Sequence, residues 1–172
     1  EKYGDDPEKT KLNGQKIRFE NPRYFTQCYE RKNLLGQGAH AKVYKCEDKR
    51  DAEKWAVKIL EKRMLKPTME REYYKEIEMM RKMDHPNLIK VHELFQDSER
   101  IYIVLELCRG GELFQEINRR KQLQHRWTEK QVARIMFQIF FALKFLHDID
   151  VVHRDIKPEN FLLYKEDDDS HI

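Results

Sequence analysis

The sequence lacks the features that would assign it to a membrane-spanning, disulfide-rich or nucleic-acid-binding class. Among 172 residues no run approaches the roughly 18 apolar residues of a membrane span, and the first ten residues have no signal-peptide core. Cys28, Cys46 and Cys108 follow no metal-site spacing, and an odd count disfavours a disulfide framework. A formal charge of +3 is too small to indicate nucleic acid as a partner. These absences predict a cytoplasmic protein, although a chain that begins at Glu1 without Met leaves open a lipid anchor at a native N-terminus that precedes it.

What the sequence does contain is charge of both signs and enough apolar residues for one core. Charged residues make up 38% of the chain, against about 25% in typical domains, which predicts a well-solvated surface. Leu, Ile, Val and Phe supply 43 of the 172 residues, above the roughly 20% needed for a stable core. Changes in composition predict a polar leader without regular structure at 1–22, a sheet lobe at 23–108 and the beginning of a helical lobe at 109–172.

The hydrophobic pattern predicts strands in the first part of the chain and helices in the second. Short β-type runs lie at 29–35, 42–46, 55–60, 89–95 and 101–105. Helices are expected at 68–83, at 113–120 and from Thr128 onward, where Thr128 and Gln131 form a capping box. An apolar stripe predicts which face of the last helix is core: Val132, Ile135, Met136, Ile139, Leu143 and Leu146.

The predicted fold class is therefore α+β. It consists of a five-stranded antiparallel lobe with one helix, followed by the first helices of a helical lobe. A short strand is expected at 151–152, just before a charged loop.

Two glycines, Gly36 and Gly38, lie in the predicted hairpin between the first two strands. A dinucleotide-binding fingerprint would connect a strand to a helix, and a P-loop would end in Gly-Lys-Ser/Thr, so neither motif fits here. Backbone N–H groups in such a hairpin can cover phosphates. An ordinary turn is the alternative.

Lys58 lies among apolar neighbours in the third predicted strand. It is either a solvent-facing side chain or a cation that points into a cleft and needs a carboxylate partner. Glu76 is the one charge on a helix face shared with Met69, Tyr73, Met80 and Met83, and an unpaired carboxylate there would be costly. The periodicity therefore predicts a Lys58–Glu76 pair.

The loop His153–Asn160 contains three residues whose chemistry suits phosphoryl transfer. Asp155 can accept a hydroxyl proton, Lys157 can neutralise a phosphoryl group, and Asn160 offers an oxygen ligand to Mg²⁺. Any one of them could belong to a charged turn without function. Together with the glycine hairpin and Lys58 in this order, they indicate a catalytic site.

The order of these motifs resembles that of the eukaryotic protein kinases, over about residues 24–172. Lys157, two residues after Asp155, is typical of serine/threonine kinases. The segments DHPNLI, LELCRGGELFQEI and VVHRDIKPENFLL resemble the calcium/calmodulin-dependent group, and ENFLL is similar to the calcium-dependent protein kinases of plants and protists.

The resemblance implies ATP and Mg²⁺ as cofactors and protein substrates with arginine upstream of the phosphoacceptor. Lys58, held by Glu76, would contact the α- and β-phosphates, Asp155 would act as base, Lys157 would meet the γ-phosphate and Asn160 would hold Mg²⁺. Glu112 would lie near the ribose and, with Glu159, could receive the substrate arginine. The remaining implied nucleotide contacts are Leu35, Gly36, Gly38, Val43, Ala56, Leu105 as gatekeeper, Glu106, Cys108 and Leu162.

Two departures from the family pattern affect the expected activity. Ala41 replaces the third glycine of the loop, and His40 stands where an aromatic residue is common. The 172 residues also contain no Asp-Phe-Gly, so the chain by itself is expected to be inactive, and any calcium-sensor module would lie outside it. The rival interpretations are a nucleotide-binding pseudokinase and a docking module without turnover.

Overall fold

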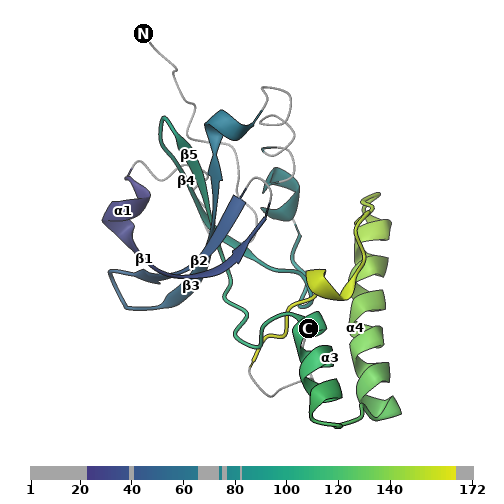
Figure 1. The fold of residues 1–172 in the computed structure, drawn as a ribbon. Coiled ribbons are helices and arrows are strands. Elements are labelled where there is room, and N and C mark those ends of the chain that lie inside the picture. The colour runs from purple at the N-terminus through teal and green to yellow at the C-terminus, as the bar shows by residue number, and fades with distance from the viewer. Residues whose placement is uncertain (1–22, 39–40, 66–73, 75–76, 82, 166–172) are drawn as a thin grey trace.

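A computed structural model describes residues 23–38, 41–65, 74, 77–81 and 83–165. A five-stranded antiparallel sheet forms one part of the chain and two long helices form the other (Figure 1). The strands are β1 (Tyr29–Gln37), β2 (Ala41–Asp48), β3 (Lys54–Glu61), β4 (Val91–Gln96) and β5 (Arg100–Leu105), in the order β1-β2-β3-β5-β4. The helices are α1 (Phe25–Cys28), α3 (Leu113–Gln122) and α4 (Glu129–Asp148), with 3₁₀ turns η1 (Lys62–Met64) and η2 (Pro158–Asn160). The predicted α+β fold class is confirmed.

The sheet has an apolar cluster on each face, as the alternation of side chains along its strands requires. Val57 and Ile59 of β3 belong to the cluster on one face. Leu60 belongs to the other cluster, which contains Ile77 from the helical residues 77–81. β3, which is mostly apolar, lies in the middle of the sheet and is therefore covered on both faces.

The short helix α1 was not predicted, because four residues are too few to show a helical period. Its Phe25 is 4% exposed and stacks on Tyr29 and Tyr102, with ring centroids 5.5 and 4.8 Å apart. Phe95 meets Phe25 edge-on at 5.9 Å. Aromatic pairs at these separations stabilise a core beyond simple burial, so the segment before β1 is part of the sheet lobe.

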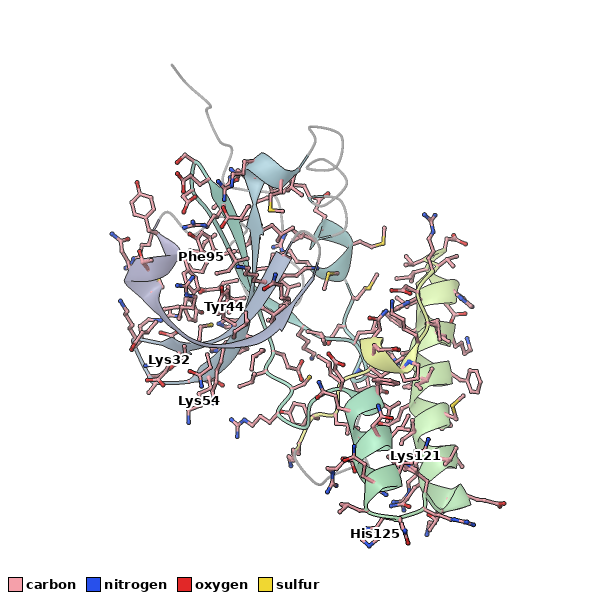
Figure 2. All side chains as sticks on the ribbon, in the orientation of Figure 1. Lys32, Tyr44, Lys54, Phe95, Lys121 and His125 are labelled. Carbon is pink, nitrogen blue, oxygen red and sulfur yellow. The ribbon has the colours of Figure 1, made fainter. Side chains whose placement is uncertain are left out.

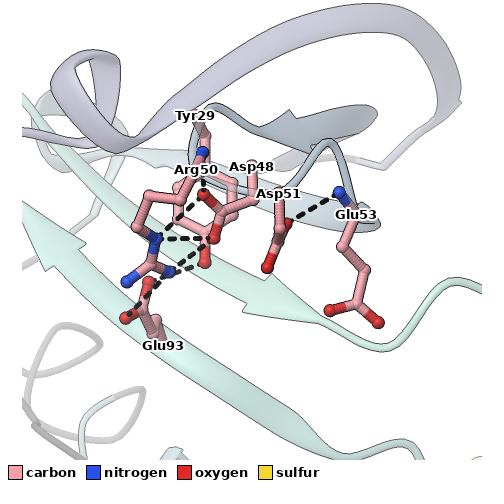
Figure 3. A network of polar contacts seen from close by, with 6 residues as sticks. All are labelled: Tyr29, Asp48, Arg50, Asp51, Glu53 and Glu93. Carbon is pink, nitrogen blue, oxygen red and sulfur yellow. Dashed lines mark hydrogen bonds and ion pairs between the residues drawn. The ribbon is translucent and has the colours of Figure 1, made fainter.

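A polar network lies beside this aromatic cluster (Figure 3). The Tyr29 hydroxyl donates to Glu93 Oε2 at 2.6 Å, and Arg50 donates to the buried carboxylate of Asp48 from its backbone N–H and from its guanidinium. The Arg50 guanidinium lowers the pKa of Asp48. The network ties β1 and the β2–β3 turn to β4.

The start of α4 follows the sequence prediction. Thr128 is its N-cap, and the Thr128 and Gln131 side chains form the expected capping box. Ile135, Ile139 and Leu146 of the predicted stripe are buried, whereas Val132 is 44% and Met136 38% exposed. Val132 and Met136 therefore lie at the margin of the buried face of α4. This face also includes Ala142, which the stripe did not contain.

The prediction of a strand at 151–152 is wrong. Asp150 has φ +59, and the N–H of Val151 bonds the carbonyl oxygen of Leu146 at 2.8 Å. This is the Schellman geometry that ends a helix, so Val151 closes α4 and pairs with no strand. The predicted leader at 1–22 and most of the helix predicted at 68–83 lie outside the described residues. No helix in the described ranges is long and apolar enough to cross a membrane.

Candidate active site

Lys58 lies on the sheet face that the helical residues 77–81 cover. The register places Lys58 opposite Val43 on β2 and opposite Ile103 on β5, and Ile103 and Ile77 belong to one apolar cluster. Lys58 is half-buried and forms no ion pair with the residues that the structure describes. Glu76, its predicted partner, lies outside the described residues. The most buried described position of this helix is Ile77, which the stripe predicted from Met69 did not include.

The glycine hairpin leaves open space where side chains would otherwise lie. Gly36 pairs with Val43, and the Gly38 N–H donates to the Ala41 carbonyl at 2.8 Å. A Cβ atom added at Gly36 would meet nothing within 4 Å, and one at Gly38 would come no closer than 3.7 Å to Ala41. Neither crowding within the protein nor a positive φ requires glycine at these two positions. The open space is compatible with close approach of a ligand to the backbone.

The predicted adenine contacts named here lie on the sheet and on the segment that follows β5. Ala56 and Leu105 are paired across β3 and β5. The Glu106 N–H donates to the Lys90 carbonyl at 3.1 Å. Among the described groups, none bonds the Glu106 carbonyl or the Cys108 N–H. These two groups, on half-buried residues that follow Leu105, can therefore bond a base.

Cys108 itself is not an activated thiol. Burial, with a smaller contribution from the nearby Glu106 carboxylate, raises the pKa of the Cys108 thiol to about 11. The thiol therefore stays protonated at neutral pH, and the backbone of Cys108 remains its predicted contribution to nucleotide binding.

Backbone bonds join the segment after the sheet to the segment after the charged loop. The Gly110 N–H donates to the Leu163 carbonyl at 2.9 Å, the Leu163 N–H donates to the Gly111 carbonyl at 2.9 Å, and Glu112 bridges to Leu162. A Cβ atom on Gly110 would lie 2.6 Å from the Leu163 Cβ, so glycine is required there. The bonds fix Leu162 beside the Glu112 end of α3.

The charged loop brings three predicted catalytic residues into contact. The Lys157 Nζ atom lies 2.8 Å from Asp155 Oδ2. Asn160 donates from Nδ2 to the backbone oxygen of Asp155 at 2.7 Å and to Asp155 Oδ2 at 2.8 Å. Because Nδ2 makes both bonds, Asn160 Oδ1 remains available as a hard oxygen ligand.

The shape of this loop depends on local backbone features. Arg154 has φ +66, a conformation that costs roughly 1–2 kcal/mol for a residue with a side chain. The Asp155 N–H donates to His153 Nδ1 at 3.3 Å, and Pro158 begins the 3₁₀ turn η2. The loop is therefore held in a specific, locally strained shape, which is common at functional sites.

Hydrogen bonds from Lys157 and then Asn160 lower the pKa of Asp155. The same contact with Asp155 raises the pKa of Lys157. Both side chains are thus charged at neutral pH and exposed to solvent, where a substrate hydroxyl or a phosphate can reach them.

The two predicted substrate carboxylates lie on neighbouring elements. Glu112 is the half-buried N-cap residue of α3, and Glu159 is an exposed residue of η2. Leu113 donates its N–H to the carbonyl of Phe161 at 2.8 Å, so the start of α3 lies against the chain just after η2. Their roles in substrate binding stay predictions.

Sequence reasoning assigned no contact to three residues that shape this site: Lys90, Gly110 and His153. The Gly110-Gly111 doublet was an available signal, because adjacent glycines often mark a close backbone approach. Lys90 acts through its backbone carbonyl, and nothing in a side-chain pattern reveals that contact.

The protein kinase domain family matches residues 29–172. The chain belongs to this family. It is 42% identical over 141 residues to calcium-dependent protein kinase 5 of Plasmodium berghei, covering 82% of this chain and 24% of that protein. It is 42% identical over 135 residues to a probable myosin light chain kinase of Dictyostelium discoideum, covering 78% and 41%. Calcium/calmodulin-dependent protein kinase type 1 of Caenorhabditis elegans is 39% identical over 145 residues, covering 84% and 40%. The chain thus spans 24% to 41% of the length of these relatives.

Proposed function

We propose that this chain carries the nucleotide-binding and catalytic-loop residues of a protein serine/threonine kinase that transfers the γ-phosphoryl group of ATP to a hydroxyl. The contact of Asp155 with Lys157 and Asn160, at 2.8 Å each, is the observation that supports it best. The names of two of these relatives, a calcium-dependent kinase and a calcium/calmodulin-dependent kinase, support calcium regulation of the whole protein.

The roles of the catalytic-loop residues follow from their charges. Asp155, ionised and oriented by Asn160, accepts the hydrogen bond of the attacking hydroxyl and receives its proton. The new O–P bond forms as the bond from the γ-phosphorus to the β–γ bridging oxygen breaks and ADP leaves. When ATP binds, Lys157 replaces its contact with Asp155 by a contact with the γ-phosphoryl oxygens and offsets their negative charge. When bound, Mg²⁺ would neutralise the phosphates, and Asn160 Oδ1 suits it as one ligand.

The sheet lobe supplies the nucleotide site. Lys58 would pair with the α- and β-phosphates from the β3 face, while the backbone of the Gly36–Gly38 hairpin covers them. The Glu106 carbonyl and the Cys108 N–H would bond the adenine, with Leu35, Val43, Ala56, Leu105 and Leu162 around it.

A thermal-shift titration tests the nucleotide site in the chain as it stands. ATP with Mg²⁺ should raise the melting temperature, and Lys58→Met should weaken the apparent affinity at least tenfold. Lys54→Met, on an exposed residue of the same strand, is the matched control and should bind as the parent does. A chain that binds no ATP would overturn the nucleotide site and leave the docking-module alternative.

A nucleotide-binding scaffold without turnover is the second candidate. Peptide phosphorylation by a protein that joins this chain to a complete catalytic domain, lost in Asp155→Asn, decides between the two.

A further inference from the structure

The positive charge of the chain is concentrated where α3 ends and α4 begins. Residues 119–134 contain six Lys or Arg and one acidic residue, Glu129, for a net charge of +5, whereas the whole chain carries +3. The remaining residues therefore sum to −2. We call the four exposed basic residues nearest the α3–α4 turn the basic tip: Lys121, His125, Arg126 and Lys130.

The basic tip differs from its basic neighbours Arg119 and Arg120 in forming no ion pair with the residues that the structure describes. Arg119 and Arg120 both donate to Glu116, at 2.6 and 2.7 Å, and Arg120 also lies 3.9 Å over the Trp127 ring. Within the described ranges no such ion pair engages Lys121, Arg126 or Lys130. Their charges are therefore directed to solvent and are available to an external anion.

Helix stability accounts for only part of this arrangement. Lys121 lies in the last turn of α3, where a cation interacts favourably with the helix dipole. Arg126 and Lys130 flank the N-cap of α4, where the dipole disfavours cations. The two residues thus lie against the local electrostatic preference, and the fold gives no stabilising reason for them.

The shape of the region favours a flat partner. The turn forms the end of the α3–α4 pair, and Lys121 and His125 project there in Figure 2. Leu123, the C-cap of α3, is 56% exposed at the same end. An exposed apolar side chain among cations suits insertion at the headgroup level of a bilayer.

We propose that the basic tip docks on an anionic membrane surface, with Leu123 entering the headgroup region. α3 is ten residues long, or about 15 Å, and its first residue Leu113 bonds the chain next to η2. Docking at the far end of α3 therefore leaves the catalytic loop accessible. The proposal does not depend on kinase activity.

Vesicle co-sedimentation of the 172-residue chain tests the docking. Binding is expected to vesicles of phosphatidylcholine with about a third phosphatidylserine, to be absent with phosphatidylcholine alone, and to fall as salt rises from roughly 0.1 M to about 0.5 M. Lys121→Glu/Arg126→Glu/Lys130→Glu should weaken binding on the order of a hundredfold, since each cation contributes roughly fivefold.

A matched variant separates the tip from net charge. Lys32→Glu/Lys54→Glu/Arg63→Glu changes three exposed cations of the sheet lobe and alters the net charge by the same amount. It should retain most of the binding, and circular dichroism should show both variants folded. Equal loss in the two variants would overturn the proposal.

Two other outcomes would show that something other than a membrane binds the basic tip. Tighter binding of a soluble polyglutamate peptide than of vesicles, measured by fluorescence anisotropy, would indicate an acidic protein partner. Vesicle binding that arises only after neutralisation of the acidic run at 166–169 would indicate that this run occupies the tip.

Discussion

His85 is a buried titratable side chain at the contact between the turn before β4 and helix α4. It is 4% exposed, its Nδ1 accepts the Asn87 N–H at 3.1 Å, and its ring lies 4.6 and 5.1 Å from the rings of Phe141 and Phe145. Its buried Nε2 has no hydrogen-bond partner among the described residues. The bond to Nδ1 requires the neutral imidazole, and burial lowers the pKa of His85.

This burial predicts a stability that depends on pH below neutrality. In the unfolded chain the His85 pKa is near 6.5, so as pH falls through that value the unfolded state binds a proton that the folded state resists. The free energy of unfolding should therefore fall, by at most about 1.4 kcal/mol per pH unit for this one proton. Urea denaturation between pH 7.5 and 5.5, values spanning roughly the unperturbed pKa, should show a smaller decline in His85→Gln than in the parent. A control, His125→Gln on the exposed tip, should leave the slope unchanged.

Glu159 governs a second prediction at the level of single residues, one that rests on the proposed function. A carboxylate that grips a substrate guanidinium contributes about 1.5–3 kcal/mol for a charged hydrogen bond. In a complete catalytic domain carrying this chain, kcat/KM should fall when arginine upstream of the phosphoacceptor is changed to alanine. That loss should shrink by on the order of tenfold in Glu159→Ala. An unchanged ratio would remove Glu159 from the substrate site and leave it as a residue of the 3₁₀ turn.

Among the secondary-structure elements, α1 is where a small segment carries a large share of packing. Phe25 fills a site bounded by Tyr29, Phe95 and Tyr102. Hydrogen bonds also join the backbone of α1 to the β2–β3 turn: Lys49 donates to the Thr26 carbonyl at 2.7 Å and to the Cys28 carbonyl at 2.9 Å. The family match begins at Tyr29, after this helix. The sheet lobe of this chain thus begins before the first residue that the family model matches.

Phe25→Ala should lower the free energy of unfolding by about 3–5 kcal/mol, the usual cost of emptying a buried phenylalanine site. Phe140→Ala provides the matched control, because Phe140 is 60% exposed and its loss should cost less than about 0.5 kcal/mol. Guanidinium denaturation followed by fluorescence measures both. Equal effects of the two substitutions would show that α1 is not part of the cooperative unit.

Across the whole molecule, the parts that the sequence predicted best are those with long periodic signals. All five strands were located, and α4 begins at the predicted capping box because Thr128 and Gln131 make a local contact. The prediction of a strand at 151–152 was wrong because the Val151 N–H bonds the end of α4 and not a strand. Two β-branched residues favour an extended backbone, but they form a strand only where a neighbouring strand is present.

Predictability of the candidate site divides in the same way. The Asp155, Lys157 and Asn160 cluster was predicted because its members are close in sequence and the loop between them is short. The pairing of Gly110 with Leu163 joins positions more than fifty residues apart, which is set by how the sheet and helix parts meet. Leu35 lies at a register shift of β1 and is 52% exposed, so its place beside a nucleotide stays a prediction.

The last prediction concerns what these 172 residues can do as a unit. Asn160 supplies one Mg²⁺ ligand, whereas phosphoryl transfer in kinases also needs the aspartate of Asp-Phe-Gly, a motif that the sequence does not contain. We therefore expect ATP binding without transfer. The assay needs a check for oligomers, because Phe137 and Phe140 of α4 are 68% and 60% exposed and apolar exposure of this extent favours association. A radiolabelled peptide assay should give no product above that of Asp155→Asn, at protein concentrations where light scattering shows a monomer. Phosphorylation by the parent chain that Asp155→Asn abolishes would mean that Asp155, Lys157 and Asn160 suffice for catalysis.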